Sequence, residues 1–176
     1  MTKEELYKII ATDESFRIER TTSKGDMDKF QEAICAFAND MPGFGKKGYL
    51  LIGVYDDGKI SGMKVDDALM KRISGIRSDG NILPLPIMTT EKVQTDEGDV
   101  LVVEVTPSFD TPVRYRGRTF IRIGPRLGEL SDLLMQDVEL GNGDDYKLHL
   151  EEVNKEVDNL YYEAIKGTVF SNGEVV

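Results

Sequence analysis

The chain has 176 residues, of which 40% are hydrophobic and 31% are charged, as is typical of a globular chain with one buried core rather than a disordered one. No apolar run approaches the roughly 20 residues that span a bilayer, and the acidic, amphipathic N-terminus is unlike a secretory signal. A single cysteine and a single histidine exclude a disulfide framework and any metal site that needs several of these residues, so we expect a cytoplasmic protein without membrane contacts.

The formal net charge of −10 is unevenly distributed along the chain. Residues 127–176 hold twelve acidic and three basic residues, so the preceding 126 residues are nearly balanced. Because binding of a polyanion depends on local patches more than on total charge, the acidic total does not exclude a nucleic-acid partner.

The N-terminal third predicts a helix, a strand and a second helix. Thr2 and Glu5 have the spacing of a capping box, and a strand is expected over residues 16–20. A longer helix is expected over residues 26–40, with Asp28 and Gln31 capping its start. Its apolar residues recur at helical spacing on one face: Phe30, Ala33, Ile34, Phe37 and Ala38.

The middle of the chain is rich in strands. The apolar run 49–54 predicts a central strand, followed by a turn at Asp57-Gly58. A helix follows, capped by Asp66 or Asp67, with three inward residues: Leu69, Ile73 and Ile76. Two hairpins are expected around Gly98 and Gly117. This order predicts an α+β fold with a mixed, largely antiparallel sheet and helices packed on it.

The C-terminal part is expected to be separate from a domain over residues 1–139. Residues 140–145 are expected to be a linker, residues 146–166 an acidic amphipathic helix, and residues 167–176 a loose tail. The helix has apolar residues at heptad spacing: Tyr146, Leu150, Val153, Val157, Leu160 and Ala164. Such a face would pack either on its own domain or on a second copy, so a homodimer is one of two expectations.

A basic stretch lies just before this acidic segment. Five arginines fall within thirteen residues: Arg114, Arg116, Arg118, Arg122 and Arg126. Strand alternation would expose Arg118, Phe120 and Arg122 on one face, where the ring could stack and the guanidinium groups could hold phosphates. Lys46 and Lys47 form a second basic patch in a glycine-rich loop that lacks phosphate-loop spacing. The alternative is a polar outer face that the acidic tail neutralises.

Three carboxylates form a separate candidate site. Glu14 precedes the first expected strand, Glu19 lies within it, and Asp56 follows the central strand. Three carboxylates that converge would provide an oxygen shell for Mg²⁺ or Mn²⁺, as used in phosphodiester hydrolysis. Asp57, by contrast, is explained as a turn residue.

The motifs "ES…IE", "AICAFAND", "GYLLIGVYDDGKISG", "PV" and "RTFIRIG" occur in this order over roughly residues 10–130. Together they resemble the Schlafen-type AlbA domain, a family usually described as DNA-binding and common in bacterial regulators. The resemblance implies a mixed-sheet α+β fold and nucleic-acid binding. In the Schlafen branch it implies metal-dependent cleavage of structured RNA by residues matching Glu14, Glu19 and Asp56. The family's Phe-Lys after the second glutamate is Arg20-Thr21 here, so Arg20 or Lys24 would replace a phosphate contact.

Three hypotheses follow in order of preference. The first is a nucleic-acid-binding protein, for DNA or RNA, with a regulatory role. The second is a metal-dependent endoribonuclease that uses the three carboxylates. The third is a dimeric interaction module whose acidic helix covers the basic face.

Overall fold

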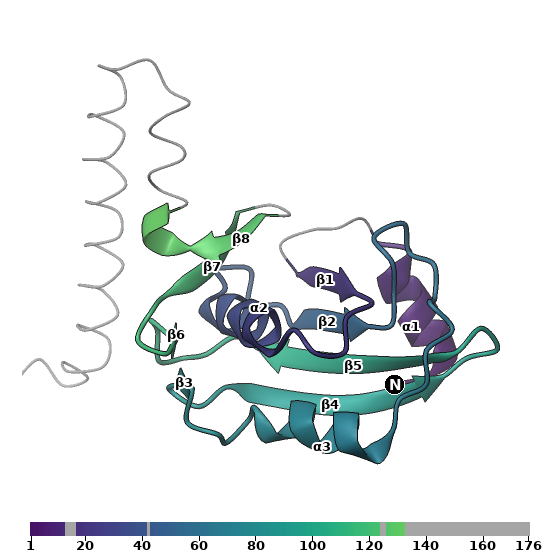
Figure 1. The fold of residues 1–176 in the computed structure, drawn as a ribbon. Helices are drawn as coiled ribbons and strands as arrows, with labels where there is room; N and C mark the ends of the chain where they lie inside the picture. Colours follow the sequence, from purple (N-terminus) through teal and green to yellow (C-terminus); the bar gives the residue numbers. More distant parts are fainter. Residues whose placement is uncertain (13–16, 42, 124–125, 133–176) are drawn as a thin grey trace, which may run out of the picture. The chain divides into compact units, whose positions relative to one another are not determined.

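The computed structural model describes residues 1–12, 17–41, 43–123 and 126–132 (Figure 1). Residues Met1–Leu130 form one compact unit. Its helices are α1 (Lys3–Ile10), α2 (Met27–Asn39) and α3 (Asp67–Gly75). Its strands are β1 (Ile18–Thr21), β2 (Gly48–Ile52), β3 (Ile82–Leu83), β4 (Ile87–Gln94), β5 (Asp99–Thr106), β6 (Arg114–Tyr115), β7 (Phe120–Ile123) and β8 (Arg126–Glu129). The predicted domain boundary at residue 139, linker, C-terminal helix and tail lie outside the described residues.

Four strands form the main sheet, in the order β1-β2-β5-β4. The strands β1 and β2 are parallel because α2 connects them as a crossover, whereas β2–β5 and β4–β5 are antiparallel pairs. The predicted α+β class with a mixed, largely antiparallel sheet is therefore confirmed. The predicted hairpin around Gly98 is also confirmed, since this glycine lies in the turn between β4 and β5.

The second predicted hairpin, around Gly117, is wrong as a two-stranded unit. Strand β6 pairs with β3, and β7 pairs with β8. A single bridge between Tyr115 and Arg118 joins the two arms next to the turn. The turn residues were recognisable from the sequence, but β6 and β7 pair with β3 and β8 and not with each other.

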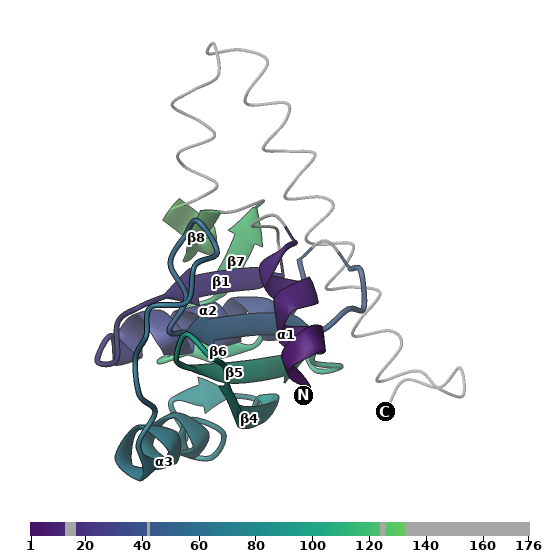
Figure 2. The same ribbon diagram turned by 90° about the vertical axis from the view of Figure 1, so that its right-hand side faces the viewer.

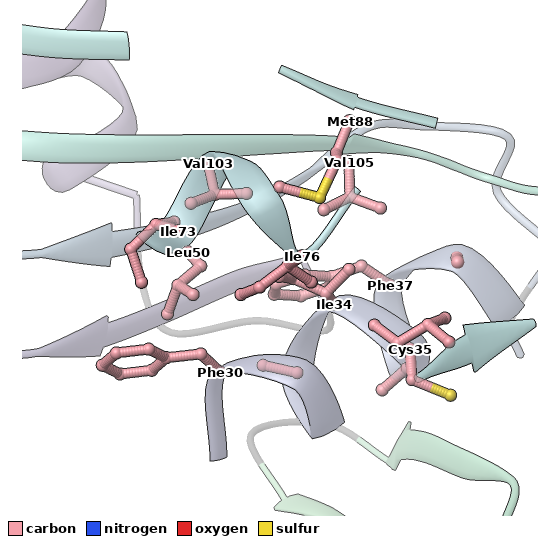
Figure 3. Packing of buried hydrophobic residues seen from close by; sticks show 14 of the residues in the cluster. Phe30, Ile34, Cys35, Phe37, Leu50, Ile73, Ile76, Met88, Val103 and Val105 are labelled. Atoms are coloured by element: carbon pink, nitrogen blue, oxygen red, sulfur yellow. The ribbon is translucent and has the colours of Figure 1, made fainter. Parts of the chain in front are cut away.

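Helices cover both faces of the main sheet (Figures 1 and 2). On one face, α2 and α3 pack in a core cluster with Leu50 and Val103, part of which Figure 3 shows. On the other face, α1 packs in a second cluster with Leu51 and Val102. Successive residues of a strand point to opposite faces of the sheet. Leu50 therefore faces α2, and its neighbour Leu51 faces α1.

Helix α2 follows its predicted amphipathic pattern closely. All five residues of the predicted apolar face are buried: Phe30, Ala33, Ile34, Phe37 and Ala38. Its cap differs from the prediction, because the Asp26 carboxylate accepts a hydrogen bond from the Lys29 backbone N–H at 3.4 Å. Asp28 instead accepts a hydrogen bond from the Tyr115 hydroxyl, and Gln31 is buried. The predicted caps of the other helices are confirmed, namely the Thr2–Glu5 capping box of α1 and Asp66 of α3.

Candidate nucleic-acid interface

Asn39, the last residue of α2, holds the segment that carries the arginines. Its side-chain amide donates to the carbonyl oxygens of Val113 at 2.9 Å and Phe120 at 2.8 Å. Its side-chain oxygen accepts from the Val113 backbone N–H at 2.7 Å. One side chain therefore fixes the chain on both sides of β6. The sequence predicted no structural role for Asn39 beyond its place in a family motif, because its partners lie more than seventy positions away.

Between these two anchors lies a tight turn formed by Arg116, Gly117 and Arg118, which we call the arginine turn. Arg116 has φ of 47° and Gly117 has φ of 80°, as a two-residue turn with both central residues in the left-handed region requires. The Arg116 N–H donates to the Asn81 carbonyl at 2.8 Å. The Arg116 side chain is 58% exposed and the Arg118 side chain is 57% exposed. The fold thus presents two guanidinium groups to solvent from a constrained backbone.

Both arginines of the turn have acidic partners on other elements. Arg116 forms an ion pair with Asp28 of α2 at 3.3 Å, and Arg118 pairs with Glu129 of β8. Arg116 also lies over the Tyr115 ring, at 5.0 Å from its centroid. Both exposed guanidinium groups of the turn are therefore already compensated by a carboxylate. Exposed ion pairs contribute only about 0–1 kcal/mol, so a phosphate group could replace either carboxylate at small cost.

The prediction that Phe120 and Arg122 lie on an exposed face of β7 is also wrong. Phe120 is 4% exposed and Arg122 is 2% exposed. Arg122 forms an ion pair with Glu19 of β1, and its guanidinium lies 5.6 Å from the centroid of the Phe37 ring. Both side chains are buried because α2 packs against β7, so neither Phe120 nor Arg122 is available for a nucleic acid.

Arg20 is a buried structural residue and not the surface contact that was predicted. Its guanidinium donates to the carbonyl oxygens of Ile10 at 2.9 Å, Thr12 at 2.6 Å and Asp56 at 3.1 Å. Only 7% of this residue is exposed. It joins the end of α1 to the turn after β2 by supplying donors to three backbone carbonyl groups.

The remaining predicted cations are exposed, but they differ in their contacts. Lys47 pairs with Glu104 of β5 at 2.6 Å, and this hydrogen bond raises the pKa of the lysine. Lys46 and Arg114 form no ion pair within the described part of the chain. Arg126 is exposed on β8. These four residues remain predicted phosphate contacts.

The three predicted carboxylates are only partly described. Glu14 lies outside the described residues. Glu19 is opposite Leu50 in the parallel pair of β1 and β2, so its side chain faces α2. Its carboxylate forms an ion pair with Arg122. The Asp56 side chain is exposed, while its carbonyl binds Arg20 on the α1 side of the sheet. Among the described residues no cluster of three His, Cys, Asp or Glu side chains could hold a metal ion, so the Mg²⁺ or Mn²⁺ site stays a prediction.

A family model described as Schlafen, AlbA_2 matches residues 14–131, which include β1, α2, the main sheet and the arginine turn. The chain belongs to the Schlafen AlbA_2 family. The resemblance read from the sequence motifs is therefore confirmed. Within the described part of this Schlafen AlbA_2 chain, no helix is long and apolar enough to cross a membrane.

Two solved structures are similar to this Schlafen AlbA_2 chain. One is the DIP2311 protein from Corynebacterium diphtheriae, with 18% identity and a TM-score of 0.47, covering 80% of this chain and 32% of that one. This chain thus spans about a third of that protein. The other is the N-terminal domain of a RecG-related protein from Nitrosomonas europaea, with 26% identity and a TM-score of 0.42, covering 62% of this chain and 75% of that one. No curated protein matches the chain.

Proposed function

We propose that this Schlafen AlbA_2 domain binds nucleic acid and that the arginine turn is its principal phosphate contact. The observation that carries the proposal is the constrained turn with two guanidinium groups that are more than half exposed. Arginine presents a planar set of donors that matches phosphate oxygens, and a preformed turn loses little conformational entropy on binding. The description of the family as DNA-binding supports the same role.

Arg114 extends this surface along the same segment. It lies on β6, two residues before the turn, and its side chain is exposed. Contacts of this kind would position a phosphate backbone without reading sequence. We therefore expect binding of both DNA and RNA, with affinity that decreases steeply as salt increases.

The test is fluorescence polarisation with a labelled DNA duplex over a range of salt concentrations. The double variant Arg116→Gln/Arg118→Gln should weaken binding, and should reduce the slope of log K against log salt by about 1.8 if both residues contact phosphates. The matched control is Lys71→Gln/Arg77→Gln, which removes the same charge from two exposed positions on and just after α3. Equal effects of the two double variants would attribute binding to net charge and contradict the role of the turn.

The endoribonuclease hypothesis is the second candidate, and no described contact favours it over binding. The pairing of Glu19 with buried Arg122 would compete with a cation for that carboxylate. The same preparations incubated with structured RNA and Mg²⁺ or Mn²⁺ test this hypothesis directly. Cleavage that disappears in Glu19→Gln, under conditions where circular dichroism shows the variant to be folded, but persists in the variant of the arginine turn, would favour the enzyme.

A further inference from the structure

Large exposed apolar side chains gather at one end of the main sheet, which we call the apolar end. Six of the eight such residues in the described part of the chain belong to it, and Tyr7 and Tyr55 are the other two. The six are Met41 (40% exposed), Phe44 (55%), Leu83 (56%), Leu85 (52%), Ile87 (53%) and Phe109 (95%). Exposed apolar side chains that lie together, as opposed to scattered singly, usually mark a binding surface.

Strand register places these residues together. Gly48, the first residue of β2, is opposite Val105, and Ile87, the first residue of β4, is opposite Thr106 near the end of β5. Residues 43–47 before β2, residues 83–86 before β4 and residues 107–113 after β5 therefore lie at the same end of the sheet, where Figure 1 shows β5 ending beside the start of β4. The Ser108 N–H donates to the Ala38 carbonyl at 2.8 Å, which ties the third segment to the end of α2.

The charges at the apolar end are mostly positive. Lys47 is paired with Glu104 of β5; the other charges of these segments, with Arg114 opposite Leu83, are two cations and one carboxylate: Lys46, Arg114 and Asp110. The whole chain has the reverse balance, with 22 basic and 32 acidic residues. This local excess suits an anionic partner, and a nearly fully exposed aromatic ring beside cations suits the stacked bases of a single strand.

We propose that the apolar end binds unpaired nucleotides, with Phe109 stacking on a base and Lys46 and Arg114 contacting the adjacent phosphates. The proposal rests on the proposed nucleic-acid binding and specifies its substrate as single-stranded. Phe109 thereby takes the stacking role that the sequence assigned to Phe120. The sequence signal that could have indicated it is a phenylalanine in a loop bounded by Pro107 and Pro112, where regular pairing is unfavourable.

The apolar end is continuous with the arginine turn. The chain from Ser108 to Arg116 follows α2 from Ala38, near its C-terminus, to Asp28 in its first turn. At 1.5 Å per residue, this part of the helix spans roughly 15 Å. A short single strand could therefore contact both surfaces, whereas bases inside a duplex remain stacked on one another and cannot reach Phe109.

The test compares the full chain and its variants by fluorescence polarisation, using a labelled 15-nucleotide poly-dT strand and a blunt duplex. Phe109→Ala should weaken single-strand binding by about 5-fold to about 150-fold and leave duplex binding unchanged. The matched control is Tyr55→Ala, which removes a 50% exposed aromatic ring at the other end of β2. Phe109→Trp should retain binding, and because the chain has no tryptophan its fluorescence should be quenched by stacking on poly-dT.

The results distinguish a failure of this inference from a failure of the proposed function. Equal single-strand affinities for Phe109→Ala and Tyr55→Ala, with the arginine-turn variant still impaired, would overturn the stacking role alone. Absence of binding to either oligonucleotide at low salt would overturn both proposals. Light scattering that shows a dimeric wild type and a monomeric Phe109→Ala, with unchanged affinity for poly-dT, would assign the apolar end to a second copy of the chain instead.

Discussion

Replacement of Asn39 by alanine should loosen the segment that carries the arginine turn. The side chain makes three hydrogen bonds, of 2.7–2.9 Å, to backbone groups of Val113 and Phe120. It thereby fixes the chain before β6 and at the start of β7, across the intervening turn. The alanine variant leaves an N–H group and two carbonyl groups without these partners.

The expected loss of stability can be worked out from these contacts. A hydrogen bond contributes about 0.5–1.5 kcal/mol net, so three give about 3 kcal/mol. The Val113 carbonyl keeps a weak donor, the Cys35 thiol at 3.3 Å, and Asn39 is only partly buried, so water can reach the vacated position. We therefore expect the free energy of unfolding to decrease by about 2–3 kcal/mol.

Urea unfolding followed by circular dichroism measures this change. With a slope near 2 kcal/mol per molar urea, the midpoint should fall by about 1–1.5 M. Asn81→Ala is the matched control, because the described contacts of Asn81 involve only its backbone N–H and carbonyl groups. If the two variants differed by less than about 0.5 kcal/mol, Asn39 would not be what fixes this segment.

Three further changes test other parts of the same fold. Glu19→Gln should lower the free energy of unfolding by about 3 kcal/mol, because Arg122 is buried and would lose its ionised partner; an unchanged urea midpoint would contradict this pairing. Gly48→Ala should cost about 1–3 kcal/mol, since the added Cβ would lie 2.3 Å from Cγ of Phe37; a thermal midpoint equal to that of the wild type would show that α2 can move away freely. Burial raises the pKa of Cys35 from 9.0 to about 11, so the unfolded chain loses this proton first and stability should decline between about pH 9 and pH 11. Cys35→Ala should lack that part of the decline, and identical pH profiles for the two proteins would refute the assignment.

Helices and turns whose formation depends on residues close together in the chain could be predicted from the sequence. The apolar face of α2 follows from helical spacing, and the capping box of α1 follows from the identities of Thr2 and Glu5. The mixed sheet follows from a crossover helix and a glycine turn. The family could be identified because its motifs combine several such local signals in a fixed order.

The candidate interface could be predicted only in part. The sequence located the arginines of residues 114–126, and strand alternation then assigned Phe120 and Arg122 to an exposed face. That assignment failed because alternation identifies two faces but does not say whether both are covered. Here α2 packs against β7, and both side chains are buried.

The sequence by itself determined the three helices, the strands of the main sheet, the positions of the turns, and that a basic stretch precedes an acidic one. The tertiary structure alone decided which charges are neutralised and which aromatic ring is exposed. The physical reason is the separation of the partners along the chain. Arg122 and Glu19 are 103 residues apart, so no local pattern relates them. Phe109 is exposed in the loop after β5, and the segments that lie beside this loop come from distant parts of the chain. The register of β2, β4 and β5 brings these segments to the same end of the sheet.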